Sequence, residues 1–256
     1  MAILNITPDS FFDGGVNATE TAWLQKVEQS VNDGAGIIDI GAVSTRPGAS
    51  YVNEEEELKR LIPAVKSVVS HFPECIISID TYRSGVAHAA IEEGAGMIND
   101  ISGGTFDTEI LNTVSRAGVP YILMHLKGDP LIMQKNPHYD NVTEEVMTFL
   151  NEQTQKALTA GVKQVIWDPG FGFDKTVEHN YQLMKDLKQF KKQGYPLLVG
   201  ISRKSMINVV LGTKPAQALN GTTVLNTYAL LNGADILRVH DVREAVQAVK
   251  ILEMMM

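Results

Sequence analysis

Short apolar runs of β-forming residues alternate with longer amphipathic stretches along the chain, and this alternation restricts the fold more than any other feature. The runs occupy residues 2–6, 36–40, 75–80, 96–101, 119–125, 164–168, 196–201 and 235–239. They are apolar almost throughout, which is typical of strands buried on both faces of a parallel sheet. Helical periodicity marks the stretches between them, as at residues 21–32, 54–71, 142–159 and 223–231. The sequence therefore predicts eight strand–helix units.

A weak internal repeat accompanies these units. Glycines precede several of the expected strands, at Gly34, Gly94, Gly118, Gly161 and Gly233. A glycine just past a helix can adopt the left-handed conformation that leads the chain into the next strand. Eight units favour a closed (β/α)₈ TIM barrel over an open doubly wound sheet, and the Gly-x-Gly-x-x-Gly fingerprint is missing after the first strand. Without a linker to divide them, residues 1–256 are expected to form one domain.

Composition narrows the classes of partner. The chain has 22 basic and 30 acidic residues, a net charge of −8, so a polynucleotide-binding surface is not expected. Its single cysteine, Cys75, cannot form an intrachain disulfide, which fits a reducing compartment. No apolar run is long enough to span a membrane, and the first residues do not resemble a signal peptide. We therefore expect a cytoplasmic protein without nucleic-acid or membrane partners.

Polar side chains gather where the expected strands end. They are Asn5, Asp39, Asp80, Asn99, His125, Asp168, Ser202, Arg238 and His240. The active site of such a barrel lies at the carboxyl ends of its strands, so these side chains should meet in one mouth. Any single Asp or Asn could instead cap the following helix, and His125 could equally be a core histidine. Together, Asp80, Asn99 and Asp168 suit a planar, nitrogen-rich heterocycle better than the dense ligand set of a zinc or two-metal site.

A second group of side chains is cationic. Arg203 and Lys204 follow the seventh expected strand, and Arg238 and His240 alternate along the eighth. Loops after strands seven and eight of this fold often hold phosphate, so an anionic substrate is expected there. For Arg203 and Lys204, the alternative is a solvated basic start of a helix.

Three loops also stand out. Residues 7–15 and 44–48 combine Gly and Pro with aromatic or cationic groups, as expected of lids, although ordinary packed loops are the alternative. Residues 170–176 superficially imitate a phosphate-binding P-loop, but Asp174 stands where that motif needs glycine.

These segments together resemble the dihydropteroate synthase family. The matching segments are ILNITPDSFFDGG (3–15), IDIGAVSTRPG (38–48), ISIDT (77–81), INDISGG (98–104), MH (124–125), DPGFGF (168–173), SRKS (202–205) and RVHD (238–241). Eight blocks in the same order make the match specific. The resemblance implies a transferase of folate biosynthesis that condenses 6-hydroxymethyl-7,8-dihydropterin diphosphate with p-aminobenzoate to give 7,8-dihydropteroate. Pyrophosphate would leave first, in a dissociative step, and the amine would then attack.

The resemblance also implies roles for individual residues. The pterin would lie against Asp80, Asn99, Met124, Asp168, Gly200 and Lys204. The diphosphate would be bound by Asn5, Arg238 and His240, with Mg²⁺ held at Asn5. The p-aminobenzoate pocket would comprise Phe11, Thr45, Arg46, Pro47, Phe173 and Ser205. The expected catalytic residues are Asp80, Asp168, Lys204, Arg238 and His240, while Ser202 would line the site and Asp39 would support it, so that Asp168→Asn should cost more activity than Asp39→Asn.

The sequence also departs from the family pattern. Ala42 and Asp174 stand where glycine is usual, and Lys127 replaces an arginine, so altered loops are expected. The β-hairpin that usually precedes the first strand is expected to be missing. Members of the family are usually homodimers and targets of sulfonamides, and both properties are expected here.

Other functions remain as alternatives. A methyltetrahydrofolate-binding methyltransferase module would share the pterin-binding Asp and Asn residues but would need neither SRKS nor STRPG. An inactive scaffold would have no use for Arg46, Lys204 and Arg238. A barrel aldolase or phosphosugar isomerase would want a catalytic Lys or Glu at a strand end, for which Lys204 is only a partial candidate.

Overall fold

The computed structural model describes residues 1–6, 16–43, 51–128 and 137–255. The strands are β1 (Ala2–Asn5), β2 (Ile37–Gly41), β3 (Ile76–Asp80), β4 (Met97–Asp100), β5 (Tyr121–Met124), β6 (Val165–Asp168), β7 (Leu198–Val199) and β8 (Ile236–Leu237). The helices are α1 (Val16–Asn32), α2 (Glu54–His71), α3 (Ser84–Glu92), α4 (Glu109–Ala117), α5 (Val142–Thr159), α6 (Val177–Lys185), α7 (Leu187–Lys191), α8 (Ser205–Leu211), α9 (Leu219–Leu231) and α10 (Val242–Glu253), with a 3₁₀ helix, η3 (Pro215–Gln217), before α9.

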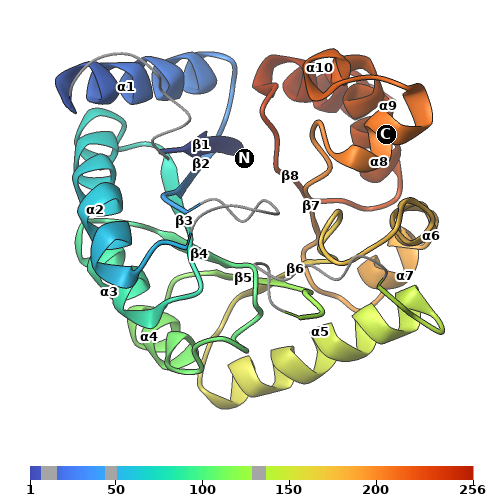
Figure 1. Ribbon diagram of the computed structural model, residues 1–256, viewed down its shortest axis with the longest axis horizontal. Helices are drawn as coiled ribbons and strands as arrows, with labels where there is room; N and C mark the ends of the chain where they lie inside the picture. Colours follow the sequence, from blue (N-terminus) through green and yellow to red (C-terminus); the bar gives the residue numbers. More distant parts are fainter. Residues whose placement is uncertain (7–15, 44–50, 129–136, 256) are drawn as a thin grey trace.

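The strands form a closed parallel barrel inside a ring of helices (Figure 1). Strands β1 to β6 pair in chain order, and β7 pairs with β8. Two single bridges join these sheets, Trp167 with Leu197 and Ala2 with Val239. The predicted (β/α)₈ barrel is thereby confirmed.

The observed helices follow the predicted ones closely where a cap marks the start. Helix α2 begins after Asn53, whose side chain accepts a hydrogen bond from the backbone N–H of Glu56 at 2.8 Å. Four glutamates follow at residues 54–57, where negative charge stabilises the positive end of the helix dipole. Helix α1 begins at Val16, five residues earlier than the periodicity indicated.

The barrel interior has an apolar plug below a polar rim. The buried side chains of the plug are Met97, Ile122, Ile166 and Leu198, against which Met1, Ile37 and Ile236 pack. Side chains two positions apart on a strand point to the same face. The next interior positions are therefore Asp39, Asn99, Met124, Asp168, Gly200 and Arg238. Each strand thus supplies packing at one level of the barrel and site residues at the next.

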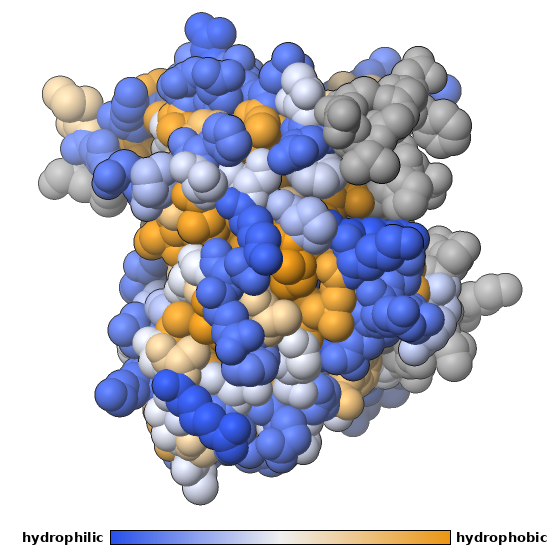
Figure 2. Space-filling model, turned by 90° about the vertical axis from the view of Figure 1, so that its left-hand side faces the viewer, coloured by the Kyte–Doolittle hydropathy of each residue, from blue (hydrophilic) through white to orange (hydrophobic). Residues whose placement is uncertain are grey.

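The outer faces of the strands pack against the surrounding helices in the main hydrophobic core. Figure 2 shows the outside of the molecule on the left of Figure 1, where α1, α2 and α3 lie and hydrophilic residues interrupt the hydrophobic ones. Within the described ranges, every helix is too short or too polar to cross a membrane.

Candidate active site

Arg238 lies between two carboxylates at the barrel mouth. Its Nε donates a hydrogen bond to Asp39 Oδ2 at 2.6 Å, and its Nη2 donates to Asp80 Oδ2 at 2.7 Å. The side chains of Arg238 and Asp80 are 20% and 17% exposed, whereas that of Asp39 is fully buried. Two charge-assisted hydrogen bonds from β8 to β2 and β3 fix the plane of the guanidinium before any substrate binds.

Asp39 also holds the neighbouring site residue on β4. Its Oδ1 accepts a hydrogen bond from Ser78 Oγ at 2.6 Å, and its Oδ2 accepts one from Asn99 Nδ2 at 3.1 Å. Asp39 therefore contacts both Asn99 and Arg238. This geometry suits the supporting role that the family resemblance implies for it.

The charges at the mouth alter one another's protonation. Burial raises the pKa of Asp80 to about 7; Arg238 opposes this shift and Asp39 adds to it. Burial likewise raises the pKa of Asp168, against the nearby ammonium of Lys204. Burial lowers the pKa of Lys204 to about 8, although Asp168 favours its charged form. Such mutual shifts are typical of functional sites.

The turn after β6 lies next to these charges. Asp168 Oδ1 accepts a hydrogen bond from the backbone N–H of Gly170 at 2.8 Å. Lys204 Nζ donates to the carbonyl of Phe171 and lies 4.8 Å from the ring centroid of Phe173. Gly170 has φ +72°, and a Cβ on it would lie 2.0 Å from the carbonyl oxygen of His125, so no other residue fits.

Ser202, His240 and Asn5 lie at the ends of other strands of the barrel. Ser202 Oγ accepts a hydrogen bond from the backbone N–H of His240 at 3.2 Å and contacts His240 Nδ1 at 3.0 Å. Burial, together with the charges of Lys26 and Arg238, lowers the pKa of His240 to about 4. Asn5 ends β1, and within the described ranges its side chain has no hydrogen-bond partner.

The structure brings most of the predicted site residues to one end of the barrel. Met124 and Gly200 are buried at interior positions, and Met124 packs with Phe173. Ser205 is exposed at the start of α8. Four residues predicted for the p-aminobenzoate pocket, Phe11, Thr45, Arg46 and Pro47, lie outside the described residues.

Arg203 does not share the position of Lys204. Its Nη2 and Nε bond the two carboxylate oxygens of Asp241 at 2.7 and 2.9 Å, and its Nη1 donates to the carbonyls of Pro215 and Ala216. The structure thus assigns Arg203 to the packing of the η3 turn, whereas Lys204 faces the site.

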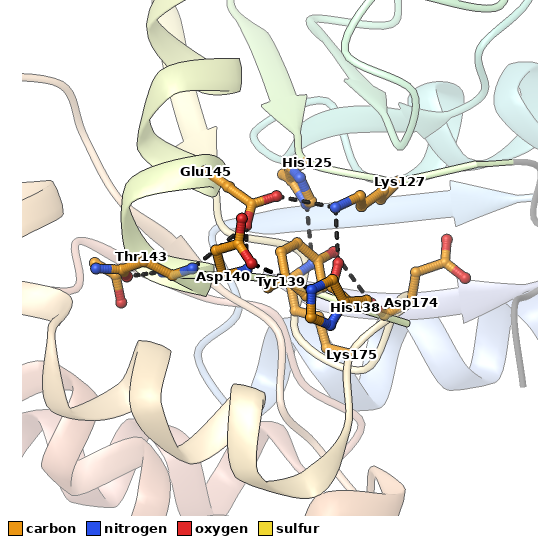
Figure 3. A network of polar contacts seen from close by, with 10 residues as sticks. His125, Lys127, His138, Tyr139, Asp140, Thr143, Glu145, Asp174 and Lys175 are labelled. Atoms are coloured by element: carbon orange, nitrogen blue, oxygen red, sulfur yellow. Dashed lines mark hydrogen bonds and ion pairs between the residues drawn. The ribbon is translucent and has the colours of Figure 1, made fainter. Parts of the chain in front are cut away.

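The three departures from the family pattern lie in different surroundings. Ala42 is completely buried. Lys127 bonds Glu145 Oε2 at 2.9 Å and lies 4.3 Å from the ring centroid of Tyr139 (Figure 3). Asp174 has φ +44°, a left-handed conformation in which glycine is the least strained residue.

Sequence reasoning missed Lys175. Its ammonium contacts His125 and two backbone carbonyls of the turn after β6. The Gly-rich turn before it was the available signal, but it was used only for the comparison with the P-loop and for the family match of residues 168–173.

The fold and the polar barrel mouth define a pterin-binding enzyme, since residues 1–240 match the family model described as "Pterin binding enzyme". The chain is 44% identical to the dihydropteroate synthase of Haemophilus influenzae over 98% of its own length and 91% of that protein. A structure of Yersinia pestis dihydropteroate synthase with a sulfonamide drug is 39% identical in sequence and has a TM-score of 0.93. The match covers 99% of this chain and 92% of that one. The Xanthomonas albilineans enzyme with 4-aminobenzoic acid has the same identity and TM-score, with 99% of this chain covering 91% of that one.

The chain belongs to the dihydropteroate synthase family. It is a pterinylmethyl transferase of folate biosynthesis, and it joins the dihydropterin unit to p-aminobenzoate with release of pyrophosphate. The methyltransferase, scaffold and aldolase alternatives are set aside by these relationships.

Proposed function

We propose that the pterin ring binds between Asp80, Asn99, Asp168 and Lys204, with Met124 and Gly200 lining the interior beneath it. The observation that carries this assignment is the convergence of β3, β6 and the β7–α8 turn on one set of mutually perturbed charges, beside Asn99 of β4, which bonds Asp39. Carboxylates accept hydrogen bonds from the amino and ring N–H groups of a pterin, and an amide can both donate and accept. The apolar plug below would then limit how deeply the flat ring enters.

The diphosphate is proposed to bind at the other side of the mouth, near Arg238, His240 and Asn5. Arg238 has Nε and Nη2 fixed by carboxylates, which aligns the guanidinium for an anion. Ser202 Oγ accepts a hydrogen bond from the backbone N–H of His240, and its hydroxyl proton can be donated to His240 Nδ1. The imidazole would then carry its proton on Nε2 and donate that N–H to phosphate.

Mg²⁺ fits this arrangement as a metal brought largely by the substrate. Within the described ranges, no group of three acidic, His or Cys side chains could hold a metal, while Asn5 offers an amide oxygen. Magnesium commonly uses one or two protein oxygens together with substrate phosphates and water. When bound, it would neutralise charge on the diphosphate.

We propose a dissociative order for the reaction. The C–O bond breaks first, and its electron pair leaves with the diphosphate, which Arg238 and His240 stabilise. The resulting pterinylmethyl cation is stabilised by the carboxylates of Asp80 and Asp168. The amine of p-aminobenzoate then forms the C–N bond and loses a proton to water. Phe173 and Ser205, with Phe11, Thr45, Arg46 and Pro47, are proposed to frame this second substrate.

Release of pyrophosphate from dihydropterin diphosphate and Mg²⁺, with and without p-aminobenzoate, tests these assignments. Release that depends on p-aminobenzoate and yields dihydropteroate is expected. Asp168→Asn should lower kcat/KM for the pterin substrate at least a hundredfold, because it removes charge from the cation and a hydrogen-bond acceptor from the ring. The matched control is Asp235→Asn. It alters an exposed ion pair with Lys191 that joins the end of α7 to the start of β8, away from the carboxyl ends of the strands. Equal losses in both variants would contradict the assignment.

A homodimer through the last helices is also proposed. The large apolar side chains of described helices that are more than half exposed are Val209, Val210, Leu211, Val224, Leu231 and Ile251, and Met254 and Met255 after α10 are exposed further still. The helical ones belong to α8, α9 and the end of α10, whereas the described side chains of α1 to α3 contribute none exposed beyond half. Large exposed apolar patches commonly mark interaction surfaces. Val210→Asp should shift the protein to a monomer in sedimentation, whereas an unchanged mass would argue against this surface.

Two further expectations remain proposals. A cytoplasmic location is supported by the single cysteine, which suits a reducing compartment. One domain over residues 1–256 is supported by the family match over residues 1–240. A single cooperative unfolding transition in calorimetry would be the expected result for one domain.

A further inference from the structure

Lys175 is a basic side chain on the β6–α6 turn that the proposed reaction does not use. Its Nζ lies 3.0 Å from His125 Nδ1 (Figure 3). It also lies 2.9 Å from the carbonyl oxygen of Gly170 and 3.0 Å from that of Phe173. An ammonium has three N–H donors, and here three acceptors surround it. Lys175 is therefore fully engaged within the protein and has no donor left for a substrate.

The three contacts tie together the two ends of one turn. Gly170 begins the turn and Phe173 ends it, so a single ammonium closes the loop between their carbonyls. On the opposite side, Lys204 Nζ bonds the carbonyl of Phe171 between them. The turn is thus held by two lysines, one at the barrel mouth and one beside β5.

His125 is a rigid and neutral anchor for this ammonium. Its side chain is 4% exposed, and its ring packs edge-on against Phe149 with centroids 5.0 Å apart. Burial lowers the pKa of His125 to about 2, with the Lys175 charge as the next cause, so the ring stays neutral and can accept a hydrogen bond at Nδ1. Tyr139 adds a second tie, because its hydroxyl donates to the carbonyl of Asp174 at 3.1 Å.

Asp168 and Phe173 depend on this turn to different degrees. Asp168 lies on β6, and its carbonyl also accepts a hydrogen bond from the His125 backbone N–H at 3.0 Å. Phe173 is beyond the strand, and its own backbone N–H reaches only the carbonyl of Gly170, at 3.2 Å. Loss of the Lys175 ammonium should therefore release Phe173 while the strand keeps Asp168 in place.

We propose that Lys175 is a positioning residue that fixes Phe173 through the Gly170–Phe173 turn and thereby sets the affinity for p-aminobenzoate. The inference rests on the proposed role of Phe173 in framing that substrate. Lys175 acts through the turn, and its side chain does not touch either substrate.

Steady-state kinetics of Lys175→Met, with each substrate varied in turn, tests the proposal. Methionine keeps the length and apolar stem but donates no hydrogen bond. The KM for p-aminobenzoate should rise roughly tenfold, as expected for loss of charge-assisted hydrogen bonds that order a pocket wall, and the KM for the pterin diphosphate should stay within about twofold. An equal rise in both KM values, or no rise in the KM for p-aminobenzoate, would overturn it.

Two controls separate the inference from its premises. Phe173→Ala should itself raise the KM for p-aminobenzoate. If Phe173→Ala leaves this KM unchanged, the proposed role of Phe173 fails. If Phe173→Ala raises this KM but Lys175→Met does not, only the role of Lys175 fails. Lys127→Met removes a lysine from the same polar network without touching the β6–α6 turn, so it should leave this KM within about twofold. A rise equal to that of Lys175→Met would point to general loosening and refute the positioning role.

Lys175→Gln serves if the methionine variant does not fold. The glutamine amide retains two N–H donors, so this variant should fold. It should raise the KM for p-aminobenzoate by a smaller factor than Lys175→Met, which removes all the donors. An unchanged KM for p-aminobenzoate in this variant, or a rise only in the KM for the pterin substrate, would also overturn the proposal.

Discussion

Replacing Asp39 by Asn should change both the stability of the barrel and the pH dependence of the reaction. The substitution keeps the shape of the side chain but removes a fully buried negative charge that accepts hydrogen bonds from Arg238, Asn99 and Ser78. Stranding one partner of a buried ion pair costs about 3–5 kcal/mol. Because Arg238 keeps its 2.7 Å bond to Asp80, we expect about 2 kcal/mol, or a Tm lower by about 4–8 °C.

The pH dependence follows from Asp80. Burial raises its pKa to about 7, and the charge of Asp39 contributes to this shift while Arg238 opposes it. In Asp39→Asn, Arg238 faces Asp80 without that competing charge, so the pKa of Asp80 should fall. The ionised form of Asp80 is the one proposed to act, so kcat/KM for the pterin substrate should rise about tenfold between pH 6 and 8 in the parent protein. In the variant, the same rise should occur at a lower pH and reach its plateau earlier.

The assay is kcat/KM for dihydropterin diphosphate between pH 5 and 9, together with thermal unfolding. Asp235→Asn is the control, because its ion pair with Lys191 is 39% to 42% exposed and should be worth less than about 1 kcal/mol. An acidic limb that stays near pH 7 in Asp39→Asn would refute the electrostatic argument, and an unchanged Tm would refute the estimated cost.

Three further substitutions test the fold around the site. Asp174→Gly should raise the free energy of unfolding by about 1 kcal/mol in denaturant titration, because glycine relieves the strain at φ +44°. Arg203→Ala should lower stability by about 2 kcal/mol by breaking the pair with Asp241, yet leave both KM values within about twofold, since its guanidinium does not face the mouth; a large rise in either KM would contradict this. Ile166→Ala, in the apolar plug, should cost about 2–5 kcal/mol in thermal unfolding, and a cost below about 1 kcal/mol would contradict the packing described.

The barrel could be predicted because its periodicities are local. Apolar runs buried on both faces, glycines at helix ends and eight repeats are all visible in the chain, and each strand formed where expected. Helix α2, with its Asn53 cap, and α5, with its Asn141 cap, match their predicted ranges, since a side-chain cap fixes where a helix starts. The start of α1 lies five residues before the predicted one.

The site was predictable as a set of residues, but not as a set of contacts. Strand ends identified Asp80, Asn99 and Asp168 without any knowledge of register. The bonds from Arg238 to both Asp39 and Asp80 depend on closure of β8 against β1, which brings together residues 199 and 158 positions apart. Local sequence carries no information on such separations.

Lys175 shows a second limit of sequence reasoning. Its partners are two carbonyls and a neutral imidazole, and none of these has a charge that a sequence pattern could pair with a lysine. Only the fold shows that the ammonium is enclosed, and burial lowers its pKa to about 7. The three contacts of the ammonium and the nearby charges of Asp168 and Asp174 offset the cost of enclosing this charge. A charged group kept at such a cost beside the site is better explained by positioning than by packing, because methionine would fill the same space without desolvation.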